Sequence, residues 1–199
     1  EDAHGQYELN FLHADALTSA DHLMLFKLAA HTLAERHGMV FSMMPKPFAN
    51  QPGSGMHFHV SLWDGERCLF DDEATKRHFI GGVLAHSAGL SALAAPTVNS
   101  YKRLVVGESL SGTSWAPAYV AHGPNNRTAL VRTLEGRFEW RLPDAAANPY
   151  LATAGPIAAG LDGIAKRAEP GPACTDDLFE QPLAALRERG IGVLPQSLG

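Results

Sequence analysis

The chain has 199 residues, of which 45% are hydrophobic and 19% are charged, a composition typical of one globular domain with a sizeable core. Its formal net charge of −5 gives no general reason to bind nucleic acid or an anionic membrane surface, so neither partner is expected. No apolar run approaches the roughly 20 residues that a membrane span needs. Two cysteines, Cys68 and Cys174, are too few for a disulfide framework, which favours a reduced, cytoplasmic setting.

The first quarter of the chain predicts two strands that flank a helix. Polar and apolar residues alternate from Gln6 to Phe11, the pattern of a half-buried strand. Apolar residues at helical spacing predict an amphipathic helix from Thr18 to His37, with Gly38 placed to end it. Met39 to Met43 is a short apolar run that indicates a second strand, and a tight glycine-containing loop follows over Asn50 to Gly55.

The middle of the chain continues with strands and one long helix. Alternation returns from Met56 to Trp63 and is followed by Asp64-Gly65, a strong hairpin-turn signal. Ala74 to Ala94 has a helical pattern, whereas Tyr101 to Val120 is rich in loop-forming residues. Arg137 to Leu142 alternates again, which predicts another strand.

The last part of the chain begins with a helix start. Asn148 followed by Pro149 is a typical cap and first-turn pair, and Pro156 is expected to disturb the helix that follows. Residues 168–199 are interpreted as a proline-rich connection with one short helix near Leu183 to Arg189.

Three of the predicted strands carry ionisable side chains on one face, because successive side chains of a strand point to opposite faces. Each such strand alone could be a solvated sheet face, and an exposed Arg-x-Glu-x-Arg ladder would contribute only about 0–1 kcal/mol. The combination is more informative, and we expect the three polar faces to line one cleft. The faces comprise Gln6, Glu8 and Asn10; His57, His59 and Ser61; and Arg137, Glu139 and Arg141.

Arginines are concentrated in the same part of the sequence. Guanidinium groups bind phosphate and carboxylate in a bidentate manner, and carboxylates bind hard cations. The residues alone therefore predict a metal and anion site in a sheet-lined cleft. The Gly53-Ser54-Gly55 stretch lacks the Gly-Lys-Ser/Thr of a P-loop, so a Walker motif gives no argument for ATP. The arginines are Arg103, Arg127, Arg132, Arg137 and Arg141.

Several motifs, taken together and in this order, resemble the signatures of the glutamine synthetase family. The resemblance runs from residue 1 to about residue 165, and Gly190 to Pro195 is also similar to the family's ending. The motifs are Glu1 to Glu8, Met44 to Pro47, Gly53 to Ser61, Asn99 to Leu104, Asn126-Arg127 with Arg132, Arg137 to Arg141, and Pro143-Asp144 with Ala147 to Tyr150.

The resemblance implies an α+β fold of the glutamine synthetase and guanido kinase type, with a curved antiparallel sheet, a polar inner face and helices outside. Residues 1–199 would be a partial catalytic domain, without the N-terminal β-grasp domain and the start of the catalytic domain. Two further carboxylate ligands of the family would precede residue 1, so the fragment alone is expected to be inactive. The full-length protein is expected to be a homo-oligomer, commonly a dodecamer of two stacked rings.

The resemblance also implies roles for individual residues. Glu1 and Glu8 would bind one divalent ion, and His57 and Glu139 a second; the ions would be Mg²⁺ or, given an imidazole ligand, Mn²⁺. The remaining roles concern ATP, glutamate and catalysis. ATP would lie beside His59 and Ser61, with Arg127, Arg132 and Arg137 on its phosphates; glutamate would be held by Gly53, Arg103, Arg127 and Arg141; and Arg127, Arg103 and Glu108 would be catalytic.

The implied reaction is ATP-dependent ligation of the glutamate γ-carboxylate to ammonia through γ-glutamyl phosphate, that is, glutamine synthesis. Two features depart from the family pattern: Pro52 precedes Gly53, and the segment from Leu104 to Pro117 is longer than the usual flap, with Trp115 before Ala-Pro. Glu108 aligns as the flap carboxylate only if the gap is moved. These departures keep γ-glutamylation of methylamine or a polyamine open as an alternative, and a non-catalytic structural relative as a second one.

Overall fold

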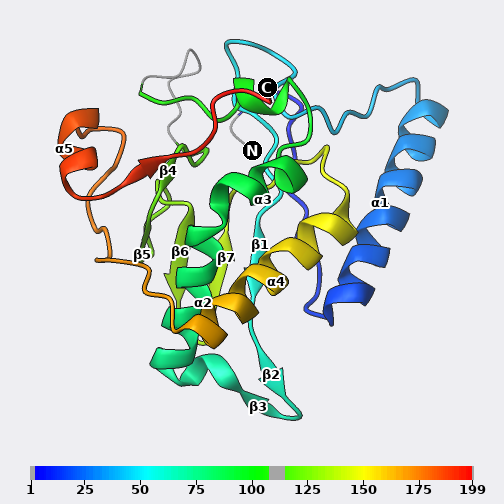
Figure 1. Ribbon diagram of the computed structural model, residues 1–199. Helices are drawn as coiled ribbons and strands as arrows, with labels where there is room; N and C mark the ends of the chain where they lie inside the picture. The colour runs from blue at the N-terminus through cyan, green and yellow to red at the C-terminus, as the bar shows by residue number, and fades with distance from the viewer. Residues whose placement is uncertain (1–2, 108–114, 199) are drawn as a thin grey trace.

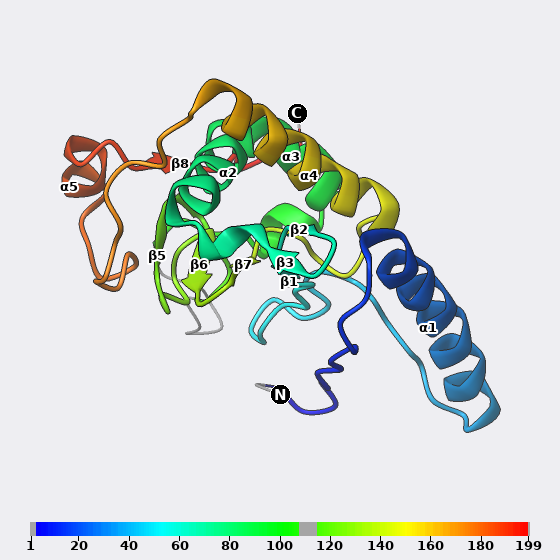
Figure 2. The same cartoon turned by 90° about the horizontal axis from the view of Figure 1, so that it is seen from below.

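The computed structural model describes residues 3–107 and 115–198. It is an α+β structure in which three helices cover one face of a four-stranded sheet (Figures 1 and 2). The longer helices are α1 Ala16–Arg36, α2 Glu73–Ala85, α3 Ser87–Ala94, α4 Pro149–Lys166 and α5 Leu183–Glu188, and the short 3₁₀ helices are η1 Leu69–Asp71 and η2 Ser100–Lys102. The strands are β1 Phe58–Val60, β2 Trp63–Asp64, β3 Arg67–Cys68, β4 Tyr119–Val120, β5 His122–Pro124, β6 Val131–Leu134, β7 Arg137–Trp140 and β8 Gly192–Val193.

The main sheet has the order β1-β7-β6-β5. β7 pairs antiparallel with β1 and β6, whereas β5 pairs parallel with β6. The sheet is therefore mixed, whereas an antiparallel sheet was expected. In the β1–β7 register His59 lies opposite Glu139, between the Phe58–Trp140 and Val60–Phe138 pairs. This register places the apolar residues of both strands on one face and the ionisable residues on the other.

The apolar face of the sheet packs against the helices. Phe138 and Trp140 are fully buried in a core with Phe79 and Val83 of α2, and Phe58 packs against the same core. Figure 2 shows α2, α3 and α4 together on this side, while the N-terminal segment and the loop before β1 lie on the other side. The polar face is therefore left to loops and to the N-terminal segment.

Helices α2 and α4 cross in close contact because glycines meet at the crossing. A Cβ added to Gly82 would lie 2.1 Å from the carbonyl oxygen of Ala159, and one added to Gly163 would lie 2.3 Å from that of His78. Gly160 similarly leaves room for the Phe79 ring. Replacing any of these hydrogens with a methyl group would push backbone or core ring atoms apart.

Helix α1 projects from the rest of the molecule beside α4 (Figure 1). It begins at a cap in which Asp15 accepts from the amides of Leu17 and Thr18. Two hydrogen bonds connect it to the body: Lys27 Nζ donates to the carbonyl of Ala147 (3.0 Å), and Tyr150 Oη donates to Asp21 (2.6 Å). No helix in the described residues is long and apolar enough to cross a membrane.

The predicted helices and the hairpin are present, with shifts at their boundaries. The single helix expected from Ala74 to Ala94 is two helices, α2 and α3, which meet at His86. The final helix α4 continues through the buried Pro156, so this proline does not end the helix. Gly65 supplies the turn between β2 and β3 with φ of 59°, as Asp64-Gly65 predicted.

Two predicted strands are absent from the described residues. The segments from Gln6 to Phe11 and from Met39 to Met43 have no regular structure, and Tyr7 and Leu9 are 87% and 59% exposed. A strand is stable only when a neighbour pairs with its backbone and its apolar face is covered. Neither segment has such a neighbour within residues 3–107 and 115–198.

Candidate active site

The polar face of β1 and β7 carries a buried carboxylate, Glu139, that binds three side chains. Glu139 is 3% exposed. Its Oε1 accepts from Arg141 Nη1 (2.6 Å) and lies 3.1 Å from His57 Nδ1, while its Oε2 accepts from Arg132 Nη1 (3.0 Å). These partners come from three segments: His57 lies just before β1, Arg132 is in β6, and Arg141 directly follows β7.

The pKa of Glu139 follows from these contacts. Burial alone would raise it, but the hydrogen bonds from His57 and Arg132 and the positive charge of Arg141 outweigh burial and hold the pKa of Glu139 far below its usual range. Glu139 is therefore ionised at neutral pH. An ionised carboxylate only accepts hydrogen bonds, so His57 donates its Nδ1–H to it.

The two histidines of the site are neutral at pH 7. Burial is the main cause that lowers the pKa of His57 and of His59, and nearby arginines add to the shift. Because His57 donates from Nδ1, its Nε2 keeps a lone pair. Arg137 Nε donates to Nδ1 of His59 (3.2 Å), so neutral His59 carries its proton on Nε2.

Arg103 lies beneath this face and is bound to main-chain carbonyls. It is 6% exposed, and its Nη1 and Nη2 donate to the carbonyls of Leu142 (2.9 Å) and Arg141 (3.1 Å). Burial lowers the pKa of the Arg103 guanidinium to about 10, which leaves it charged at neutral pH. The glycine loop packs on it, since a Cβ at Gly53 or Gly55 would lie 3.1 Å or 2.9 Å from the Arg103 side chain.

The predicted metal ligands are brought together only in part. His57 and Glu139 are adjacent, but Glu8 is exposed on the N-terminal segment, and Glu1 lies outside the described residues. Within residues 3–107 and 115–198 no group of three His, Cys, Asp or Glu residues is arranged to hold a metal ion. His57 Nε2 and the remaining carboxylate lone pairs of Glu139 could supply two ligands to a cation. Its other ligands would have to come from substrate, water or residues outside this pair.

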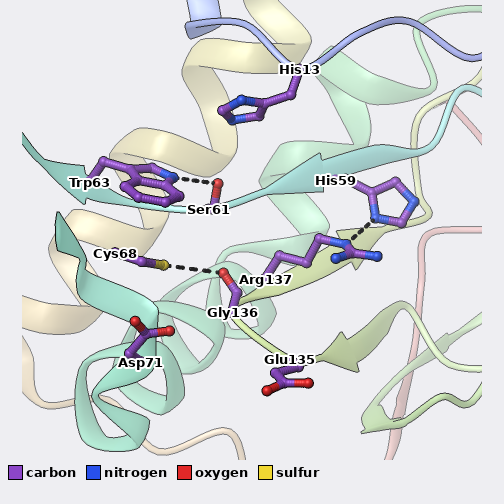
Figure 3. Close-up of a pocket in the computed structure, with 9 residues that line it drawn as sticks. All are labelled: His13, His59, Ser61, Trp63, Cys68, Asp71, Glu135, Gly136 and Arg137. Atoms are coloured by element: carbon purple, nitrogen blue, oxygen red, sulfur yellow. Dashed lines mark hydrogen bonds between the residues drawn. The ribbon is translucent and has the colours of Figure 1, made fainter. Parts of the chain in front are cut away.

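A cavity of about 500 Å³ opens beside the polar face (Figure 3), within the size range of small-molecule sites. Three of its lining residues, His59, Ser61 and Arg137, are predicted ATP contacts. Trp63 Nε1 donates to Ser61 Oγ (2.8 Å), and Cys68 Sγ lies 3.4 Å from the carbonyl of Gly136. The lining residues are His13, His59, Ser61, Trp63, Cys68, Asp71, Glu135, Gly136 and Arg137.

Six of the lining residues were not predicted as site residues: His13, Trp63, Cys68, Asp71, Glu135 and Gly136. Trp63 continues the alternation of His57, His59 and Ser61, so the same period of two could have placed it on the polar face. His13 lies in the segment before α1, and nothing in the local sequence signals its approach to the cavity.

The profile of the family described as "Glutamine synthetase, catalytic domain" matches residues 1–199. The chain belongs to the glutamine synthetase family. Glutamate–methylamine ligase of Methyloversatilis universalis is 51% identical over 207 residues, covering 100% of this chain and 47% of the relative. Glutamine synthetase of Rhizobium meliloti is 46% identical over 190 residues, covering 90% of this chain and 44% of the relative.

Solved structures of the family agree with this fold. A structure titled as a GmaS/ADP complex superposes with a TM-score of 0.84 at 43% identity, covering 93% of this chain and 44% of that one. A ligand-free GmaS structure gives a TM-score of 0.79 at 41% identity, covering 93% of this chain and 43% of that one. The glutamine synthetase fold expected from the sequence is confirmed. The chain spans about half the length of the relatives it matches.

Two further arginines of the candidate site are placed differently from the buried ones. Arg132 is bound on both sides, because its Nε also donates to Asn125 Oδ1 (2.9 Å). Arg127 is exposed, and its Cζ lies 5.6 Å from the ring centroid of Trp115. Glu108, the predicted flap carboxylate, lies outside the described residues.

Proposed function

We propose that the full-length protein is an ATP-dependent ligase that joins the γ-carboxylate of glutamate to a small amine, and that residues 1–199 are part of its catalytic domain. The observation that carries the proposal is the match to the family's catalytic domain over the whole chain, together with a polar sheet face that collects the family's motif residues. Family membership also supports the use of ATP with a divalent metal.

The chemistry has two steps. A γ-carboxylate oxygen of glutamate attacks the γ-phosphorus of ATP and breaks its bond to the bridging oxygen, which leaves as ADP. The amine nitrogen then attacks the γ-carbonyl carbon of γ-glutamyl phosphate, phosphate leaves, and the nitrogen loses a proton. A divalent metal, held in part by His57 and Glu139, would supply neutralisation of phosphate charge.

In this proposal, residues of this chain bind and orient ATP and glutamate. Arg137 and Arg132 face the phosphates, beside a cavity in which His59 and Ser61 contact the nucleotide. Arg127, which is exposed, would reach the transferring phosphoryl group. Arg141 and the main chain at Gly53 would hold glutamate, with Arg103 fixing the carbonyls of residues 141 and 142 beneath them. Glu108 would serve as the flap carboxylate.

Methylamine is the acceptor that we favour, and ammonia is the second candidate. The sequence alone put ammonia first because glutamine synthesis is the majority activity of the family. A methylamine ligase at 51% identity, against 46% for the Rhizobium meliloti glutamine synthetase, shifts the preference. Pro52 and the apolar Trp115 support the same choice, while a polyamine is left as a further alternative.

An amine panel tests the proposal. Full-length protein is assayed for phosphate release with ATP, glutamate, and Mg²⁺ or Mn²⁺, against ammonia, methylamine and a polyamine. We expect kcat/KM for methylamine to exceed that for ammonia at least about tenfold, a difference of about 1.4 kcal/mol in transition-state binding. Equal or better use of ammonia would make the protein a glutamine synthetase. Absence of glutamate-dependent phosphate release with every amine would favour the non-catalytic relative.

The domain and assembly expectations become part of the same proposal. A β-grasp domain and the start of the catalytic domain would precede these residues, residues 168–199 would be the C-terminal connection with its short helix α5, and the full-length protein would form a dodecamer of two stacked rings. The mass of the purified full-length protein in solution, measured by light scattering, tests the assembly directly.

A further inference from the structure

Trp115 contacts two arginines of the site with two different groups. Its carbonyl oxygen accepts from Arg141 Nη2 (3.0 Å), and its indole ring lies under the Arg127 guanidinium, whose Cζ is 5.6 Å from the ring centroid. Arg141 directly follows β7, and Arg127 lies in the loop before β6. One residue therefore connects the segment before β4 to both arginines.

The charges of the site explain why Arg127 needs this contact. Glu139 is already bound to Arg132, Arg141 and His57, and in the described part of the chain no carboxylate lies within ion-pair distance of Arg127. The positive charge of Arg127 is nevertheless felt by Arg141: burial lowers the pKa of Arg141, Glu139 opposes this shift, and Arg127 adds to it. The face of an indole ring attracts a guanidinium without neutralising it.

The contact also limits where Arg127 can point. An exposed arginine has many rotamers, and ordering it for a reaction costs entropy. Trp115 is 48% exposed, but its main chain is fixed by Arg141, which is 3% exposed. The ring is thus attached to a buried group, and the guanidinium that stacks on it acquires a defined position.

We propose that Trp115 is a positioning residue that orients the Arg127 guanidinium for phosphoryl transfer. The inference rests on the proposed ligase function, in which Arg127 lies between glutamate and the transferring phosphoryl group. An arginine held in place stabilises developing charge better than a mobile one, since misplacement by about 1 Å can cost roughly 100-fold in rate.

Steady-state kinetics of full-length variants test the proposal. We expect Trp115→Leu to lower kcat about 10- to 100-fold, with KM for ATP changed less than about threefold. Trp115→Phe keeps an aromatic face and should retain kcat within about threefold. Leu161→Ala, on the exposed side of α4 and 49% exposed in the wild type, is the matched control and should leave kcat unchanged. A kcat for Trp115→Leu within twofold of the wild type would overturn the proposal.

A double-mutant cycle separates positioning from a general structural effect. If Trp115 acts through Arg127, the variant carrying both Trp115→Leu and Arg127→Gln should be no slower than Arg127→Gln alone. Losses that multiply would show that Trp115 acts independently and would overturn the inference. Circular dichroism of each variant establishes that it folds.

A fluorescence measurement decides the contact without relying on activity. The emission of Trp115 is obtained as the difference between wild-type and Trp115→Phe spectra. Arg127→Gln should change this emission, whereas Arg137→Gln, which contacts His59 instead, should not. An unchanged Trp115 emission in Arg127→Gln would overturn the proposal. Absence of phosphate release by the wild type would instead refute the ligase function, and the emission result would still stand.

Discussion

At the scale of single residues, Glu139 is the acceptor that holds three side chains on the polar sheet face. Glu139→Gln keeps the shape but removes the charge that pairs with Arg132 and Arg141, leaving buried cations without their counter-charge. We expect a loss of about 3 kcal/mol in the free energy of unfolding, measured by chemical denaturation of the full-length protein. Glu35→Gln, at an exposed position of α1, is the control and should change stability by less than about 0.5 kcal/mol.

The stability difference between the wild type and Glu139→Gln should depend on pH. The pKa of Glu139 is lowered in the folded state, so its stabilising contribution is present above the unfolded value of about 4.3 and is lost as the pH falls toward the folded pKa. The stability difference between wild type and Glu139→Gln should therefore narrow below about pH 4. A difference that stays constant down to pH 3 would contradict the role assigned to this carboxylate.

The pKa of Asp144 is shifted in the opposite direction to that of Glu139. Asp144 is fully buried and its Oδ2 has no hydrogen-bond partner among the described residues, although its Oδ1 accepts from the amide of Ala146 (2.9 Å). Burial raises the pKa of Asp144, against the opposing effects of Ser100 and Arg103. The folded state thus binds a proton more tightly than the unfolded state does.

The consequence of this raised pKa is a loss of stability as the pH rises from about 3.9 through the folded pKa. Asp144→Asn cannot ionise and should lack this loss, so its stability relative to the wild type should increase between pH 4 and pH 7. Urea denaturation at several pH values measures the trend. A relative stability that is flat or falls over this window would show that Asp144 is charged without penalty.

The sequence predicted which residues share a face but not what each one binds. Alternation placed His57, His59, Glu139 and Arg141 on the polar side of their strands. The register pairs His59 with Glu139, and His57 and Arg141 contact the Glu139 carboxylate. Arg103 was predicted to hold glutamate, yet its Nη atoms donate to carbonyls 38 and 39 residues away. Such long-range main-chain partners leave no local pattern, so a motif cannot reveal them, and its role toward glutamate stays a prediction.

At the scale of elements, the crossing of α2 and α4 depends on the absence of a side chain at Gly82 and Gly163. The atoms that a new methyl group at either position would meet are backbone atoms of the facing helix, which cannot rotate away. Gly82→Ala and Gly163→Ala should each lower the free energy of unfolding by about 2–3 kcal/mol because the helices must separate.

Gly89 in α3 provides the matched control. A Cβ there would have no heavy atom within 4 Å, and alanine favours a helix more than glycine does. Gly89→Ala should raise stability by about 0.5–1 kcal/mol. Equal effects of Gly82→Ala and Gly89→Ala in thermal or urea unfolding would contradict the close packing of α2 on α4.

Helices were easier to predict than strands for a physical reason. Helical hydrogen bonds are local, so a helix can be predicted from its own residues. In α1 and α4 these are the cap residues Asp15 and Asn148 and the apolar residues at helical spacing that follow them. A strand needs a neighbouring strand to pair with, and the local sequence does not show which segment that is. Gln6 to Phe11 has the pattern without the partner in the described residues, whereas the same pattern at β1 and β7 finds one.

At the scale of the whole molecule, exposed apolar side chains concentrate on the projecting helix α1 and the segments beside it. Leu25 and Leu28 of α1 are 65% and 67% exposed, Leu12 is 93% exposed, and Val40 is 96% exposed. Large apolar side chains that lie together on a surface often mark a contact with another segment or partner. The chain spans about half the length of the relatives it matches, and in the proposed full-length protein further polypeptide would cover these side chains.

The site is incomplete in the same region. The N-terminal segment that carries Glu8 is exposed and lies on the polar side of the sheet (Figure 2), and the described residues bring only His57 and Glu139 together as neighbouring potential ligands. A cation that neutralises a triphosphate usually needs about six ligands, several of them carboxylate or water oxygens. His57 and Glu139 would leave about four positions to water, to substrate oxygens or to ligands from outside the described residues.

We therefore expect the 199-residue chain expressed alone to be inactive, with phosphate release at least about 1,000-fold below that of the full-length protein, as expected when several groups that act as a unit are removed. The assay uses ATP, glutamate, methylamine or ammonia, and Mg²⁺ or Mn²⁺, with circular dichroism to establish that the fragment is folded. Comparing the fragment at low and saturating Mn²⁺ separates weak metal binding from a missing catalytic group, because weak binding alone would be overcome at high metal. Amine-dependent phosphate release by the folded fragment at low metal would show that His57, Glu139 and the arginines around them suffice.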